Sequence, residues 1–92
     1  MAIYLLFGKY SAESLKGISD KRSEEARALI KKHGGELKAA YATLGDVDLM
    51  MAVDLPDNKQ AMAVSMALAK ATGIAFTTSP AMHIDEFDKL AG

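Results

Sequence analysis

AIYLLFGKY, residues 2–10, carries an apolar side chain at nearly every position. Successive side chains of a β-strand point to opposite faces of the sheet, so this segment predicts a strand that is apolar on both faces. Ile3, Leu5 and Phe7 share one face, and the residues that alternate with them share the other. Two helices can cover one face of such a sheet, and the second face would then expose more apolar surface than a soluble monomer tolerates. We therefore expect a second copy of the chain to cover it.

Strand and helix signals alternate along the rest of the chain. Gly34-Gly35 ends the first long helix, and Asp57, with Gln60 three residues later, has the pattern of a capping box for the second. The expected elements are strands at residues 2–10, 36–44, 47–55 and 74–82, one helical turn around Leu15 and Ile18, helices at 20–33 and 57–72, and a short helix capped by Asp85 at 85–90.

This β-α-β-β-α-β-α order predicts an α+β, ferredoxin-like fold in a single domain over residues 1–92. The antiparallel sheet is expected to have the strand order 4-1-3-2. Pro80 agrees with this order, because proline cannot donate a ladder hydrogen bond and belongs on an edge strand such as the fourth.

The alternation along the strands also predicts which side chains lie beneath the helices. We assign Ile3, Leu5 and Phe7 to that core, together with Met51 and Val53 of the third strand. The opposite face mixes bulky and small side chains, which suits packing against a second sheet. The predicted dimer face consists of Tyr4, Leu6, Tyr10, Met50 and Ala52.

Composition excludes several classes of protein. The formal net charge of −1 gives no electrostatic reason to bind nucleic acid or an anionic membrane. The absence of cysteine excludes disulfides, zinc ribbons and thiol catalysis, and with two histidines we expect neither a metal nor another cofactor. The longest apolar stretch, residues 61–69, is too short to span a bilayer. No basic leader follows Met1, so we expect a cytoplasmic protein.

The stretch GGELKAAYATLGDVD at residues 34–48 resembles the GYD-domain family, which is named for a Gly-x-Tyr-Asp sequence between its second and third strands. The similarity extends to Gly8-Lys9-Tyr10, Leu55-Pro56-Asp57, the alanine-rich helix and Thr77-Thr78. It implies a ferredoxin-like fold of the dimeric α/β-barrel type and a family whose activity is not established. Val47 stands where the family has its tyrosine, and Ala42 where an aromatic residue often sits, so no role can rest on those side chains here.

Three side chains are candidates for a pocket. Gly45-Asp46 is expected to form a hairpin turn, and Asp48, which follows it, can accept hydrogen bonds from a ligand or from the backbone of the turn. Tyr41 can donate its phenolic proton or fill space on its strand. His83, at the end of the fourth strand, can transfer a proton near neutral pH or lie partly exposed.

Two functions remain open from the sequence. The first is a homodimeric small-molecule-binding or assembly module, whose partners are a second copy of the chain and a small apolar ligand. The alternative is a small cofactor-independent enzyme, similar to monooxygenases and isomerases of the same fold type. Its pocket would lie between the sheet and the helices and would use Tyr41, Asp48 and His83.

Overall fold

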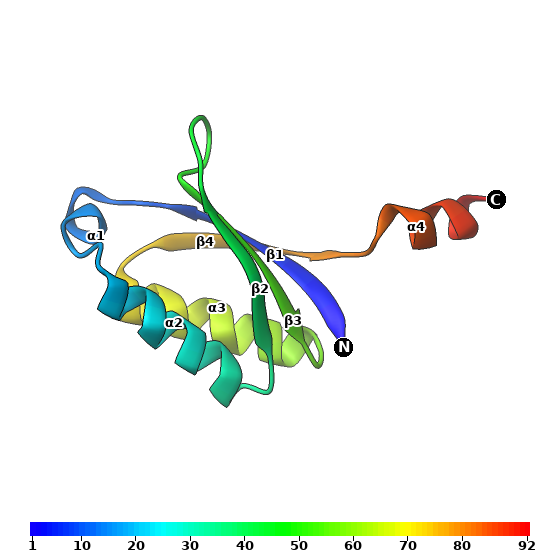
Figure 1. Ribbon diagram of the computed structural model, residues 1–92, viewed down its shortest axis with the longest axis horizontal. Coiled ribbons are helices and arrows are strands. Elements are labelled where there is room, and N and C mark those ends of the chain that lie inside the picture. Colours follow the sequence, from blue (N-terminus) through cyan, green and yellow to red (C-terminus); the bar gives the residue numbers. More distant parts are fainter.

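The computed structural model describes all of residues 1–92 and shows a four-stranded antiparallel sheet with two long helices on one face (Figure 1). The elements are β1 (Ala2–Lys9), α1 (Ala12–Lys16), α2 (Asp20–Lys32), β2 (Glu36–Ala42), β3 (Leu49–Leu55), α3 (Asn58–Thr72), β4 (Ala75–Ala81) and α4 (Ile84–Ala91). The sheet order β2-β3-β1-β4 is the predicted order 4-1-3-2 read from the other edge. The ferredoxin-like fold is therefore confirmed, with Pro80 on the edge strand β4.

The ends of α3 follow the sequence signals closely. The Asp57 carboxylate accepts a hydrogen bond from the backbone N–H of Gln60 at 2.9 Å, and Gly73 ends the helix with a φ of 73°. The return bond of a capping box is not formed. The Gln60 side-chain oxygen instead lies 3.1 Å from Nδ1 of His33, which joins the C-terminal end of α2 to the first turn of α3.

The last helix differs from the prediction. It begins at Ile84, with His83 in the N-cap position and no side-chain capping bond, so the predicted cap at Asp85 is wrong. In Figure 1, α4 projects beyond the end of β4 and lies apart from both long helices. No helix in the structure is both long enough and apolar enough to cross a membrane.

One face of the sheet packs against α2 and α3 and forms the core. Ala26 and Leu29 of α2 pack at its margin, as their spacing with Ile30 predicts. The core consists of nine buried side chains: Tyr4, Leu6, Ile30, Met51, Val53, Leu55, Ala61, Val64 and Leu68.

The predicted dimer face is wrong for three of its five residues. Tyr4 and Leu6 are buried in the core, and Tyr10 lies on the helix side of the sheet. The cause is the register between β1 and β3, which places each odd-numbered residue of one strand opposite an even-numbered residue of the other. The assignment of odd-numbered residues in both strands to one face is therefore impossible. Met50 and Ala52 do lie on the side away from the helices, where the prediction put them.

The uncovered side of the sheet is called the outer face below. Its centre is Ile3, Leu5 and Phe7 of β1, paired with β3 residues that include Met50 and Ala52. These five side chains are half-buried in the single chain, and no helix lies over them (Figure 1). Strand β1 is thus apolar on both sides, as its sequence indicates. The prediction exchanges the two sides, because it assigns Ile3, Leu5 and Phe7 to the core and Tyr4 and Leu6 to the dimer face.

The corrected face assignment predicts different effects for two leucine truncations. Leu6 is 0% exposed, so Leu6→Ala is expected to lower the free energy of unfolding by about 2–5 kcal/mol through lost burial and a cavity. Leu15, in α1, is 56% exposed, and Leu15→Ala is expected to lower it by less than about 1 kcal/mol. Urea unfolding followed by circular dichroism measures both values. Equal losses would contradict the placement of Leu6 beneath the helices.

Candidate functional site

Asp48 connects the loop after β2 to the end of β1. Its Oδ2 accepts a hydrogen bond from the backbone N–H of Tyr10 at 3.0 Å, and its own N–H donates to the carbonyl of Gly8 at 2.9 Å. Its carbonyl oxygen accepts from the N–H of Thr43 at 3.0 Å. The carboxylate therefore stabilises the backbone around it, which is the structural alternative that the sequence left open.

Tyr41 lies on the outer face, opposite Met50 of β3. Its side chain is 58% exposed, and no hydrogen bond holds its hydroxyl group within the chain. Tyr41 therefore extends the apolar surface of the outer face and presents a phenolic group at its margin.

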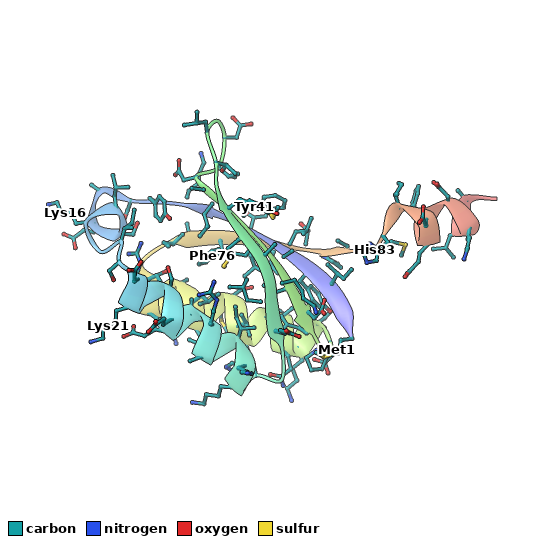
Figure 2. The ribbon with its side chains drawn as sticks, viewed as in Figure 1. Met1, Lys16, Lys21, Tyr41, Phe76 and His83 are labelled. Carbon is teal, nitrogen blue, oxygen red and sulfur yellow. The ribbon has the colours of Figure 1, made fainter.

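His83 stands in the extended segment between β4 and α4 and is exposed. Figure 2 shows it far along the sheet from Tyr41, near the base of the projecting helix. Neither of the two main cavities is lined by Tyr41, Asp48 or His83. The structure does not bring the three predicted pocket residues together within one chain.

A cavity of about 140 Å³, which we call the helix–sheet cavity, lies between the sheet and the helices, where the sequence placed the pocket of the enzyme alternative, but other residues line it. Its apolar walls include Leu49 and Met51 of β3 and Phe76 of β4. Its polar lining consists of Tyr10, Ser19, Arg22, Ser23, Arg27 and Thr72. No carboxylate and no histidine is among the lining residues.

The guanidinium of Arg22 is held in place at this cavity. One of its nitrogens, Nη1, donates to the carbonyl of Ser14 at 2.6 Å, and the group lies 5.8 Å from the ring centroid of Tyr10. Arg27, on the same helix, is exposed and has no ion-pair partner, because the ion pairs of this structure all involve Lys38. The cavity therefore carries positive charge without a neutralising acid.

The spacing of residues in the sequence already placed both arginines beside the apolar stripe of α2. Arg22 precedes Ala26 by four residues and Arg27 precedes Ile30 by three, so both border the apolar stripe of α2. The pattern alone does not distinguish a solvated helix margin from the edge of a cavity. That distinction depends on how far the sheet lies from the helix.

A second, wider hollow of about 450 Å³ lies between α3 and β4, and we call it the α3–β4 groove. On one side Tyr4 donates its hydroxyl hydrogen to Oδ1 of Asn58 at 2.6 Å, and Met62 and Met66 form the helix side. Phe76, Thr78 and Pro80 line it from the strand side. No group of three or more histidine and carboxylate side chains is placed to hold a metal ion.

Comparison with models of protein families found a match over most of the chain. The model of the GYD domain matches residues 4–91. The chain belongs to the GYD-domain family. Among curated proteins, no sequence matches it significantly.

The fold of the GYD domain is similar to that of part of two regulatory proteins of known structure. It is similar to the leucine response regulatory protein of Mycobacterium tuberculosis, with a TM-score of 0.59 and 8% identity over 89% of this chain and 51% of that protein. It is also similar to an AsnC family transcriptional regulator from Agrobacterium tumefaciens, with a TM-score of 0.60 and 17% identity over 89% of this chain and 50% of that one. The GYD domain thus spans about half the length of each regulator, and the likeness is one of fold.

The role of Asp48 leads to a test by substitution. Asp48→Ala removes the acceptor for the Tyr10 N–H and is expected to lower the free energy of unfolding by about 1–2 kcal/mol. Asp48→Asn keeps an oxygen that can accept this bond and is expected to recover most of that loss. Asp46→Ala, in the exposed part of the same loop, is the control and is expected to change little. Thermal unfolding measures all three, and a loss from Asp46→Ala as large as that from Asp48→Ala would contradict the assigned role.

Proposed function

We propose that this GYD domain is a self-associating module that binds a small molecule without chemical conversion. The uncovered outer face is the observation that carries the proposal. Leu5 and Phe7 lie at its centre with Met50 beside them, and no helix covers this side of the sheet (Figure 1). A second sheet packed about 10 Å away would remove this surface from water.

The composition of the outer face suits contact between two sheets. Leu5 lies between Ala52 of β3 and Ser79 of β4, and Phe7 lies between Met50 and Thr77. Leu5 is thus flanked by small side chains on both strands and Phe7 by one on β4, so the bulky groups of one copy can enter the spaces beside those of another.

Charged groups occur at one end of the outer face, around the start of β2. Lys38 Nζ lies 3.4 Å from a carboxylate oxygen of Glu36 and 3.7 Å from one of Asp54. Protein interfaces typically combine an apolar centre with a polar, solvent-accessible rim. The distribution of charge on this face therefore supports its use as an interface.

Binding is favoured over catalysis by the lining of the helix–sheet cavity. The enzyme alternative places Tyr41, Asp48 and His83 at a pocket in this position, yet none of the three lines the cavity, and neither does any other histidine or carboxylate. The apolar walls and the few polar groups are typical of a small-molecule site. The similar fold of a leucine response regulatory protein agrees with a binding role, although it is an analogy of fold alone.

Self-association can be tested by placing a charge on the outer face. Wild-type protein is expected to be a dimer at micromolar concentration, and Leu5→Glu is expected to shift it to monomer because the buried carboxylate would have no partner. Leu44→Glu is the matched control, since Leu44 is 100% exposed in the β2–β3 loop. Size-exclusion chromatography with light scattering reads the mass directly. A monomeric wild-type protein, or equal masses for Leu5→Glu and Leu44→Glu, would overturn the proposal.

A further inference from the structure

We propose that the helix–sheet cavity binds a small monocarboxylate with a hydrocarbon body about the size of a six-membered ring. This inference rests on the proposed binding function and names the class of ligand. The cavity volume, the apolar walls and the two guanidinium groups each limit that class.

The volume limits the size of the ligand body. An apolar cavity of about 150 Å³ is known to accommodate benzene, and the helix–sheet cavity has about 140 Å³. Leu37, Leu68 and Ile74 add to the apolar lining formed by the strands, so the part of the ligand inside is hydrocarbon. A larger body, such as a fused ring system, does not fit entirely within this space.

The arginines define the head group. A guanidinium has five N–H donors, and the Arg22 group uses one hydrogen bond to Ser14 within the chain. The remaining donors of Arg22 and all those of Arg27 are available to a carboxylate, which guanidinium groups bind in a planar, two-point geometry. The hydroxyl groups of Ser19 and Ser23 lie in the same lining.

The same lining disfavours amines and amino acids. An ammonium group requires an anionic or carbonyl acceptor close by, and no carboxylate lines the cavity. The positive charge of Arg22 and Arg27 also repels a cation. A carboxylate that lacks an amino group is therefore the preferred class.

The experiment titrates ¹⁵N-labelled protein with benzoate and, separately, with benzylamine, which has a ring of the same size and the opposite charge. Benzoate is expected to shift the amide signals of Arg22, Ala26 and Phe76, and benzylamine is expected to leave them unchanged. Arg27→Gln is expected to weaken benzoate binding about threefold to tenfold. Lys31→Gln removes the same charge from an exposed site on α2 outside the cavity and is expected to have no effect.

A second pair of variants tests the location. Ala26→Leu fills the cavity from α2 and is expected to abolish the benzoate shifts, whereas Ala28→Leu, exposed on the same helix, is expected to retain them. Binding of benzylamine in the cavity without benzoate would overturn the ligand class and leave the binding function standing. Absence of any shift with either compound would overturn both the ligand class and the small-molecule-binding function. Light scattering would still report separately on self-association.

An independent observation concerns the C-terminal arm, residues 82–92, which includes α4. Ile84, Phe87 and Leu90 are 67%, 53% and 74% exposed, and in Figure 1 the helix lies apart from the sheet and from the other helices. At 100° per residue these three side chains form one stripe along the helix. An isolated helix of eight residues is marginal in water, so this one requires a surface to pack against.

We infer that α4 docks in the α3–β4 groove of a second copy. The acidic residues Asp88 and Glu86 border the two sides of the apolar stripe. The exposed Met62 and Met66 of the groove lie on α3 between Lys59 and Lys70. The apolar stripe of the arm thus matches the exposed methionines of the groove, and the acidic residues beside the stripe match the two lysines of α3 that lie outside the groove lining.

The path of the chain favours a second copy over the arm's own groove. His83 has φ −61° and ψ 143°, so the backbone stays extended after β4 and carries α4 away from the groove of its own chain (Figure 1). An arm that reaches a neighbour would add a second contact to the proposed pairing of outer faces. This inference therefore rests on self-association.

The absence of natural cysteine makes a spin-label experiment specific. Ala91→Cys protein without isotope label carries a nitroxide spin label at the introduced cysteine and is mixed with ¹⁵N-labelled protein that has no spin label. Any broadening of the amide signals is then intermolecular. Broadening is expected at Lys59, Met62 and Met66, and Glu13→Cys, labelled on α1, is the control that is expected to leave these signals sharp. Lys59→Glu is expected to reduce the broadening, whereas Lys32→Glu on α2 is not.

The outcomes separate the arm from the proposed dimer. A dimeric mass without broadening on α3 would overturn the docking of the arm and leave outer-face pairing intact. Broadening of α3 only when label and isotope share one chain would show that α4 folds onto its own groove, which would also overturn the inference. A monomeric mass would overturn both proposals.

Discussion

The antiparallel register between β1 and β3 sets which side chains of the sheet meet the helices and which meet the surroundings. Leu6 lies opposite Met51, so both enter the core, and Leu5 lies opposite Ala52, so both point away from it. If one of these strands slipped by one residue, its inward-facing and outward-facing side chains would exchange places. Because β1 is apolar on both sides, either arrangement buries one apolar set and leaves another uncovered.

The uncovered apolar side chains of the outer face favour association with a partner. A chain of 92 residues buries only about 60–65% of the surface that its unfolded form exposes, so an interface adds a large fraction of the attainable burial. The outer face and α4 are separate places where this chain presents apolar surface without covering it. Pairing of the sheets would satisfy the first, and docking of α4 would satisfy the second.

On the helix-covered side of the sheet, packing is incomplete. Two helices do not fill all the space above four strands, and the remaining volume lies beneath α2 beside Phe76. Arg22 is fixed there by the carbonyl of Ser14 and the ring of Tyr10, so its charge is held at the cavity. An apolar space with fixed positive charge at its lining is a physical description of a site for an anion with a hydrocarbon body.

The sequence by itself determined the elements, their order and the ferredoxin-like topology, since these depend on local signals such as the Asp57 cap, Gly73 and the alternation of strand residues. It also indicated that β1 is apolar on both faces, because alternation requires no knowledge of neighbours. Only the tertiary structure decided which face Leu6 occupies, because that depends on the pairing between strands. It alone also placed Tyr41 and His83 apart and Arg22 beside a cavity, because distances between elements arise from packing and leave no mark on the spacing of residues along the chain.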